Sequence, residues 1–158
     1  MIAVMTADEK QARRSALMKK VRRQDTAPEM IVRRALHARG WRYRLHRKDL
    51  PGTPDIVFPG RQAVVFVNGC FWHGHDCKLG RPPKSRPEFW GPKLAGNRER
   101  DKRKIRELSA AGWRVMTVWQ CSLVNQVDTF DEIEEFLRSD HAVSETRPAE
   151  KSSRCSNS

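Results

Sequence analysis

Hydrophobic positions recur along the chain with two different spacings, one typical of helices and one of strands. Thr6 and Thr26 are each followed three residues later by a glutamate, the pattern of a helix-initiating capping box. They predict a polar helix through about Lys20 and a second helix, with an apolar stripe, that ends at Gly40. The strict alternation of residues 41–46 then predicts a half-exposed strand.

The middle of the chain predicts a β-hairpin. The apolar runs Ile56–Phe58 and Ala63–Val67 are separated by a Pro-Gly turn. A charged helix is expected from about Lys93 to Ala111, a strand over 113–119, and a last helix from a third capping box at Thr129. The order α-α-β-β-β-α-β-α predicts an α/β fold with a mixed central sheet flanked by helices.

Length and composition limit the class of protein. The 158 residues suit one domain, which we expect over residues 1–140, and the Ser-, Arg-, Glu- and Pro-rich residues 141–158 are expected to form a disordered tail. No run approaches the roughly 18–20 apolar residues of a membrane span. The first residues lack the pattern of a secretory signal, so we expect a cytoplasmic protein.

The chain is strongly basic, with 31 lysines and arginines against 19 acidic residues and a formal net charge of +12. Such a charge favours a polyanionic partner, and nucleic acid is the first candidate. The same charge also suits a basic protein with a merely solvated surface, and it carries no information on base sequence.

Cysteine and histidine gather between two of the predicted strands. Cys70, His73, His75 and Cys77 lie within eight residues, and Cys121 follows the last predicted strand. Thiolate and imidazole ligands at this density favour Zn²⁺ in a structural site with four protein ligands. Five candidates compete for four positions, and spacing alone does not exclude any of them.

Several segments resemble the very-short-patch-repair (Vsr) family of DNA mismatch endonucleases. The strongest are LPGTPDIV at 50–57 and VVFVNGCFWH at 64–73, and the likeness extends from Thr6 to Leu137 through 88–90, 97–101, 112–115 and 118–121. The resemblance implies a restriction-endonuclease-like fold of the PD-(D/E)xK type, catalytic Mg²⁺ and structural Zn²⁺. It also implies cleavage of one DNA strand on the 5′ side of the thymine in a T:G mismatch that arises from 5-methylcytosine deamination.

The family's context implies further partners. They are a companion cytosine-5 DNA methyltransferase and a repair polymerase, and the enzyme is expected to act as a monomer on bacterial nucleoid DNA. Two other functions fit the same residues: a nuclease of the same fold that cuts matched DNA, and a non-catalytic zinc-dependent DNA-binding module.

The resemblance also assigns catalytic roles. Asp55 matches the aspartate that holds Mg²⁺, and Val67 matches a position whose backbone carbonyl contacts the metal. His73 matches an active-site histidine, and Glu29 and Asp101 match acidic positions around it. From the residues alone, Asp55 fits a turn after proline and Glu29 fits a helix cap.

The zinc ligands that the resemblance implies include only one of the two histidines. Cys70, His75, Cys77 and Cys121 match the zinc ligands. Asn68 stands where the family commonly has a second active-site histidine, and an amide cannot exchange protons near neutral pH.

Mismatch recognition would use apolar side chains. Phe71 and Trp72 match an aromatic pair that wedges into the base stack, and Met18 matches a residue inserted from the first helix. Lys93 and Asn97 match positions near the mismatched bases. An ordinary core role is the alternative for Phe71 and Trp72. The basic residues of the first helix, expected to clamp phosphates, are Arg13, Arg14, Lys19 and Lys20.

Overall fold

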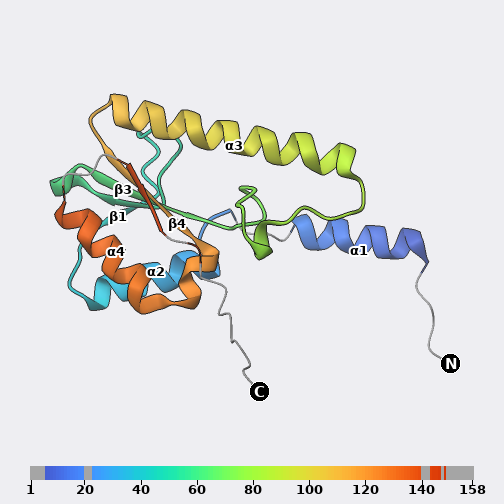
Figure 1. Cartoon of the computed structure of the whole chain (residues 1–158), viewed down its shortest axis with the longest axis horizontal. Helices are drawn as coiled ribbons and strands as arrows, with labels where there is room; N and C mark the ends of the chain where they lie inside the picture. Colours follow the sequence, from blue (N-terminus) through green and yellow to red (C-terminus); the bar gives the residue numbers. More distant parts are fainter. Residues whose placement is uncertain (1–5, 20–22, 140–142, 147, 149–158) are drawn as a thin grey trace, which may run out of the picture.

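The structure is a computed structural model that describes residues 6–19, 23–139, 143–146 and 148. The predicted order of elements is confirmed, and one further strand follows the last helix (Figure 1). The helices are α1 (Ala7–Lys19), α2 (Ala27–Ala38), α3 (Pro87–Ala110) and α4 (Gln126–Arg138). The strands are β1 (Arg44–Leu45), β2 (Ile56–Phe58), β3 (Ala63–Asn68), β4 (Arg114–Trp119) and β5 (Val143–Glu145). Short 3₁₀ turns span Pro59–Arg61, Lys78–Gly80 and Gln120–Val124.

The five strands form one mixed sheet in the order β1-β2-β3-β4-β5. The pairs β1–β2 and β2–β3 are antiparallel, whereas β3–β4 and β4–β5 are parallel. The predicted hairpin and the mixed sheet are therefore confirmed. Because β3 and β4 are parallel and Asn68 pairs with Trp119, the residues that follow these two strands leave the sheet at the same edge.

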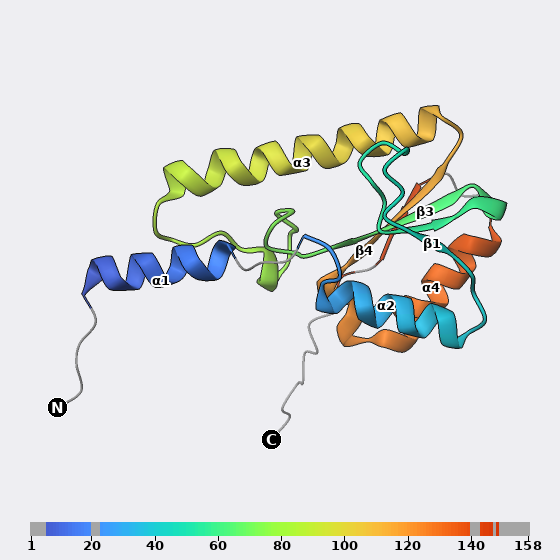
Figure 2. The same ribbon diagram turned by 180° about the vertical axis from the view of Figure 1, so that it is seen from behind.

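Helices cover both faces of the sheet. Helices α2 and α4 lie on one face and α3 crosses the other, as Figures 1 and 2 show from opposite sides. Alternate residues of β3 point to the two layers: Val65 packs in the cluster that contains Leu36 of α2, and Phe66 packs with Leu108 of α3. Helix α1 extends away from these layers in both views.

Two of the three predicted capping boxes exist. The Thr6 amide donates to the Glu9 carboxylate at 2.8 Å and the Glu9 amide donates to the Thr6 hydroxyl at 3.3 Å. Thr26 caps α2 and accepts from the Glu29 amide. The third prediction is wrong, because α4 begins at Gln126 and the Thr129 hydroxyl is turned inward, where it donates to the carbonyl of Ser122 at 2.7 Å.

Two boundaries differ from the prediction because tertiary contacts override local signals. The strand expected from Trp41 shortens to Arg44–Leu45, since the Trp41 ring packs edge-on against Phe58 at 6.0 Å. Helix α3 begins at Pro87 rather than near Lys93, with Pro92 inside it. Its first turns pack aromatic side chains against the 69–80 loop, and we attribute the tolerated proline to that packing.

The expected tail contains structure, so the prediction of disorder from residue 141 is wrong for residues 143–145. They form β5, an edge strand parallel to β4. The buried Thr146 that follows accepts a hydrogen bond from the Trp119 amide at 2.9 Å. The other residues of the expected tail, apart from residue 148, lie outside the described part. Among the described helices, none has the length and apolar character needed to cross a bilayer.

Candidate active site and metal centre

One open groove of about 1920 Å³ runs beside the sheet edge where β3 ends. This volume exceeds the roughly 300–1,000 Å³ of a pocket for a small ligand, so the groove suits a segment of a polymer. Most of the expected site residues line it: Glu29, Asp55, Val67, Asn68, Trp72, His73, Lys93, Asn97 and Asp101. The fold therefore gathers residues that are up to 72 positions apart, counted from Glu29 to Asp101.

Asp55 sits in the loop directly before β2, with its carboxylate against β3. Its Oδ2 accepts a hydrogen bond from the backbone N–H of Val67 at 2.8 Å. Burial raises the pKa of Asp55 to about 6, and the nearby Glu29 carboxylate adds to the increase, against the effect of the Val67 amide. The site thus contains a largely buried carboxylate that a bound cation would stabilise in its charged form.

Two residues missed by the sequence analysis, Arg33 and His46, connect Glu29 with Asp55. The buried Arg33 guanidinium donates to Glu29 Oε2 at 2.9 Å and contacts His46 Nε2 at 2.6 Å. A guanidinium can only donate, so Nε2 accepts and His46 carries its proton on Nδ1. That nitrogen lies 3.9 Å from Asp55 Oδ1. Glu29 therefore acts both as a helix cap, through Thr26, and as the anchor of Arg33.

His73 is fixed by a carboxylate on α3. Its Nδ1 lies 2.5 Å from Asp101 Oδ2, and Asp101 Oδ1 pairs with Lys104 Nζ at 2.7 Å. Burial raises the pKa of Asp101, but the hydrogen bonds from His73 and Lys104 outweigh it and hold the pKa below its usual value. Because an ionised carboxylate can only accept, Nδ1 of His73 donates to Asp101, and the neutral form of the ring would have its lone pair on Nε2.

Asn68 and Val67 end β3 at the groove. Both are buried, and both line the groove together with Asp55. Val67 approaches Asp55 through its amide, so its own backbone is next to the carboxylate. A carboxylate oxygen and a backbone carbonyl oxygen are both ligands that a hard cation prefers.

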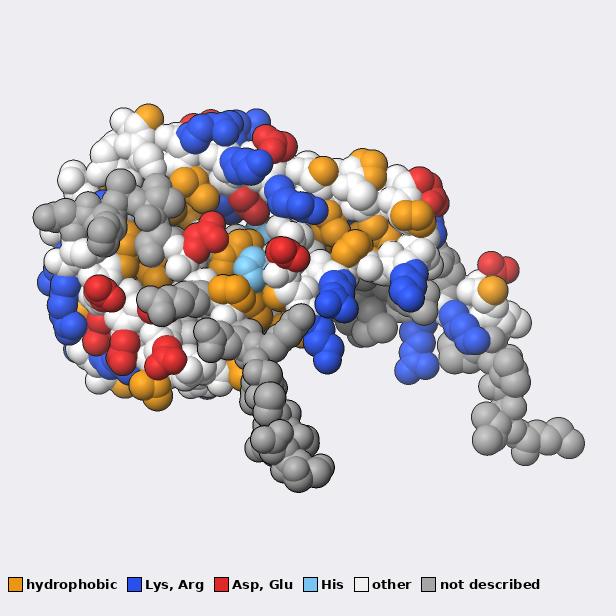
Figure 3. Space-filling model, viewed as in Figure 1, with side chains coloured by type: hydrophobic (Ala, Val, Ile, Leu, Met, Phe, Trp, Pro, Cys, Tyr) orange, Lys and Arg blue, Asp and Glu red, His pale blue; other side chains and the backbone are white. Residues whose placement is uncertain are grey.

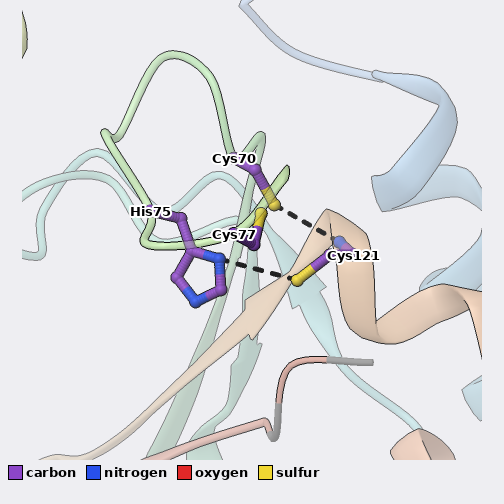
Figure 4. Close-up of side chains that lie close together, drawn as sticks. All are labelled: Cys70, His75, Cys77 and Cys121. Carbon is purple, nitrogen blue, oxygen red and sulfur yellow. Dashed lines mark hydrogen bonds between the residues drawn. The ribbon is translucent and has the colours of Figure 1, made fainter. Parts of the chain in front are cut away.

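Four of the five metal candidates converge beside this groove. The ligand atoms of Cys70, His75, Cys77 and Cys121 all lie within 4.8 Å of one another (Figure 4). His75 Nδ1 is 3.5 Å from Cys121 Sγ, which matches the separation of about 3.5 Å expected for nitrogen and sulfur on one tetrahedral zinc. His73 is not in this group, so the geometry agrees with the ligand set that the family resemblance implied.

The loop is shaped so that its ligands meet Cys121. A Cβ atom at Gly80 would lie 1.9 Å from the carbonyl oxygen of His75, so only glycine fits there. The His75 ring stacks on Trp119 with centroids 4.1 Å apart. Burial raises the pKa of the Cys70 thiol to about 12, whereas it lowers the pKa of His75. A metal would therefore have to displace a firmly held thiol proton from Cys70.

An aromatic cluster, formed by Phe71, Trp72, Phe89 and Trp90, lies at one end of the groove. Phe71 packs edge-on against Trp72 and Trp90, in each case with centroids 5.1 Å apart. The Lys93 ammonium lies within 6 Å of the rings of Trp72, Phe89 and Trp90. Phe71 and Trp72 are half-buried and belong to none of the core clusters of the described residues.

Helix α3 presents one stripe to the groove. Trp90, Lys93, Asn97, Asp101 and Lys104 recur every three or four residues and all line it. Asn97 also anchors the 69–80 loop, because its Nδ2 donates to the Trp72 carbonyl at 2.7 Å. This helical spacing is visible in the sequence and could have identified Trp90 and Lys104, which the sequence analysis did not select.

Two of the residues predicted to contact DNA lie wholly or partly outside the part of the chain that the structure describes. Met18 lies in α1, but its side chain is not among the described ones, and Lys20 lies outside the described residues. On the face in Figure 3, lysine and arginine side chains lie along α3 and near α1, on either side of exposed hydrophobic side chains. This charge distribution suits a polyanion that follows the groove.

The comparisons with known proteins agree with this geometry. The family model described as DNA mismatch endonuclease Vsr matches residues 7–79. The chain is 61% identical over 111 residues to type II nicking enzyme V.XorIIP of Xanthomonas oryzae pv. oryzae, which covers 70% of this chain and 82% of that protein. It is 40% identical over 127 residues to type II nicking enzyme V.NmeAIP of Neisseria meningitidis, with coverage of 80% and 91%. It is 41% identical over 121 residues to DNA mismatch endonuclease Vsr of Escherichia coli, with coverage of 77% and 78%.

The mixed sheet, the carboxylate-containing groove and these relatives define a DNA endonuclease with a restriction-endonuclease-like fold. More specifically, the chain belongs to the Vsr family of DNA mismatch endonucleases, as the sequence motifs predicted.

Proposed function

We propose that this protein nicks one strand of duplex DNA on the 5′ side of the thymine in a T:G mismatch and so starts very short patch repair. One observation carries the proposal: a single groove contains Asp55, the His73–Asp101 pair and the ring of Trp72. This supports the proposal, because candidate cleavage groups and a candidate base-stack wedge line one groove.

Asp55 and the Val67 carbonyl would hold Mg²⁺, because carboxylate and carbonyl oxygens are its preferred protein ligands. The raised pKa of Asp55 supports this assignment, since it marks a buried carboxylate in need of a cation. When bound, Mg²⁺ would polarise the scissile phosphate and stabilise the leaving oxygen. Cys70, His75, Cys77 and Cys121 would hold structural Zn²⁺, which suits a closed set of sulfur and nitrogen donors.

His73 would act as the general base. Asp101 keeps the Nδ1 proton in place, so Nε2 is the atom that accepts a proton from the attacking water. The water oxygen forms a bond to phosphorus, a bridging P–O bond breaks, and the departing oxygen keeps the electron pair and takes a proton from solvent. Asn68 would orient water through its amide without exchanging protons. Glu29 would act indirectly, by holding Arg33 and His46 beside Asp55.

Recognition would depend on the aromatic cluster. Insertion of Phe71 and Trp72 requires the bases to unstack, which costs a few kcal/mol per step. This cost is lower at a weakened pair than in matched DNA. Met18 would insert from α1, while Lys93 and Asn97 would lie near the mismatched bases. A T:G substrate links the enzyme to a cytosine-5 methyltransferase that creates the methylated site and to a repair polymerase. We further propose that it acts as a monomer in the cytoplasm.

The test is a cleavage assay on duplexes of identical sequence that carry T:G, T:A or C:G at one position, with both strands labelled. We expect a nick only in the thymine strand of the T:G duplex, only with Mg²⁺, and none with Asp55→Ala. The exposed Asp131→Ala serves as a carboxylate control that should cleave normally. Equal cleavage of matched DNA would favour a restriction-like nuclease, and tight binding without cleavage would favour a binding module.

A further inference from the structure

Lys104 lines the groove and is far less exposed than the basic residues beside it on α3. Its side chain is 17% exposed, whereas those of Lys102 and Arg103 are 65% and 64% exposed. Its Nζ pairs with Asp101 Oδ1 at 2.7 Å. A partly buried lysine requires compensation, and here the compensating carboxylate is the one that also orients His73.

The lysine side chain is held along its whole length. A Cβ atom at Gly52, which has φ +72°, would lie 2.7 Å from both Cβ and Cδ of Lys104, so the loop backbone closes directly over the aliphatic stem. The ammonium lies 4.2 Å from the centre of the Phe66 ring on β3. These contacts fix the position of the charge, in contrast to a flexible surface lysine.

The fixed ammonium has hydrogen-bonding capacity to spare. An ammonium group has three donors, and one suffices for Asp101. In the part of the chain that the structure describes, Asp101 is its one ion-pair partner. Lys104 shares the Asp101 carboxylate with His73, and its charge also acts on Asp55, so a phosphodiester between Asp55 and His73 would be close to this ammonium.

We propose that Lys104 is a further catalytic residue, whose ammonium contacts the scissile phosphate and stabilises the negative charge that develops on it during strand cleavage. This inference rests on the proposed function of the same groove. It assigns Lys104 an electrostatic role separate from proton transfer by His73. A positive charge that is already in position stabilises the transition state effectively, because nothing has to reorganise around it during the reaction.

The first measurement is the single-turnover cleavage rate of a T:G duplex at saturating enzyme. Lys104→Met should lower this rate about 100-fold, beyond its loss of duplex affinity, while the folded state is retained. Lys104→Arg should retain more activity than Lys104→Met. Lys102→Met is the matched control, since Lys102 forms the same kind of i,i+3 pair, with Glu99, on the exposed side of α3. It should cleave at the wild-type rate.

A second measurement separates phosphate contact from a purely structural effect through Asp101. A duplex with a neutral methylphosphonate at the scissile linkage should bind wild type and Lys102→Met more weakly than native DNA does, and this difference should be clearly smaller for Lys104→Met. If Lys104→Met still prefers the charged linkage as strongly as wild type does, the contact does not exist and the inference is wrong. Wild-type cleavage of T:G DNA together with full activity of Lys104→Met would also overturn it. Absence of cleavage by the wild type would instead refute the proposed function.

Discussion

At the scale of single residues, Asp55 lies where it could bind a cation, but its ionised carboxylate destabilises the folded protein. Its carboxylate is largely buried between a loop and β3, with one backbone N–H as its hydrogen-bond donor and a second carboxylate, Glu29, nearby. Burial that raises a carboxyl pKa also destabilises the folded protein once the group ionises. The chain therefore retains at this position a charge that folding alone would not favour.

Asp55→Asn should stabilise the metal-free protein and abolish cleavage. The folded pKa of about 6 exceeds the unfolded value of about 3.9, so the cost is fully present above pH 6 and disappears as the pH falls towards 4. A difference of about two units corresponds to about 3 kcal/mol. We expect a higher melting temperature for Asp55→Asn at pH 7.5 and a smaller difference at pH 4. An unchanged melting temperature at pH 7.5 would contradict the burial argument.

The same pKa predicts how the cleavage rate of the wild type declines at low pH. Proton binding to Asp55 competes with metal binding, so cleavage should decline as the pH drops below about 6 and recover in part when Mg²⁺ is increased. The measurement is the single-turnover rate between pH 5 and 8 at two Mg²⁺ concentrations. A decline that Mg²⁺ does not relieve would point to another group.

At the scale of elements, the 69–80 loop depends on the end of β4. Cys121 is the one member of the described metal group that lies outside the loop, and its amide donates to Cys70 Sγ at 3.3 Å. His73, which lies within the same loop, is held by Asp101 from α3. The loop itself, the end of β4 and α3 thus together determine where His73 lies. A metal would connect the loop to the end of β4.

Cys121→Ser should weaken zinc binding by at least about 100-fold and lower the melting temperature, because the loop loses its link to the sheet. The control is Cys155→Ser, which replaces a cysteine outside the described metal group. Zinc content measured after dialysis, together with thermal unfolding, decides the matter. Retention of one zinc per chain in Cys121→Ser would exclude Cys121 as a ligand.

Trp72→Ala should reduce mismatch discrimination more than it reduces binding to matched DNA. Stacking of one base on an aromatic ring contributes about 1–3 kcal/mol, so the ratio of affinities for T:G and T:A duplexes should fall about tenfold or more. Trp72→Phe, which keeps a ring in the aromatic cluster, should retain much of the ratio. Equal losses for both duplexes would contradict the wedge.

At the scale of the whole molecule, the net charge of +12 sits on a fold whose groove follows α3. Two helices on the opposite face of the sheet form the main core with it, and in the proposed function α3 and the 69–80 loop would contact DNA. In the proposed function, the charge would supply affinity for any duplex, while the groove would supply selectivity.

DNA affinity should therefore depend strongly on salt. If about six phosphates are contacted, affinity should fall about 10³-fold between 50 and 200 mM salt for matched and mismatched duplexes alike. The ratio of the two affinities should change little, because recognition of the mismatch does not depend on counterion release. Fluorescence anisotropy titrations at several salt concentrations measure both quantities. A ratio that collapses with salt would mean that charge, not the aromatic cluster, reads the mismatch.

Much of the fold was predictable because its signals are local. Capping boxes, a Pro-Gly turn and apolar runs depend on near neighbours, and they gave the order of elements from α1 to α4. The strand β5 was missed, since three residues in a polar segment carry little pattern of their own. It forms because β4 has an unpaired edge and Thr146 can bond to the Trp119 amide and the Ser122 hydroxyl.

The sequence by itself determined the chemistry available to this protein: a basic chain, a dense set of thiol and imidazole ligands, and motifs specific to one nuclease family. Only the tertiary structure decided which charged groups gather in and beside the groove. His46, Arg33 and Lys104 look like surface residues in the sequence, because each is polar and none belongs to a motif. The packing of α2, β1 and α3 around Asp55 turns them inward, and such long-range contacts leave no local periodicity to read.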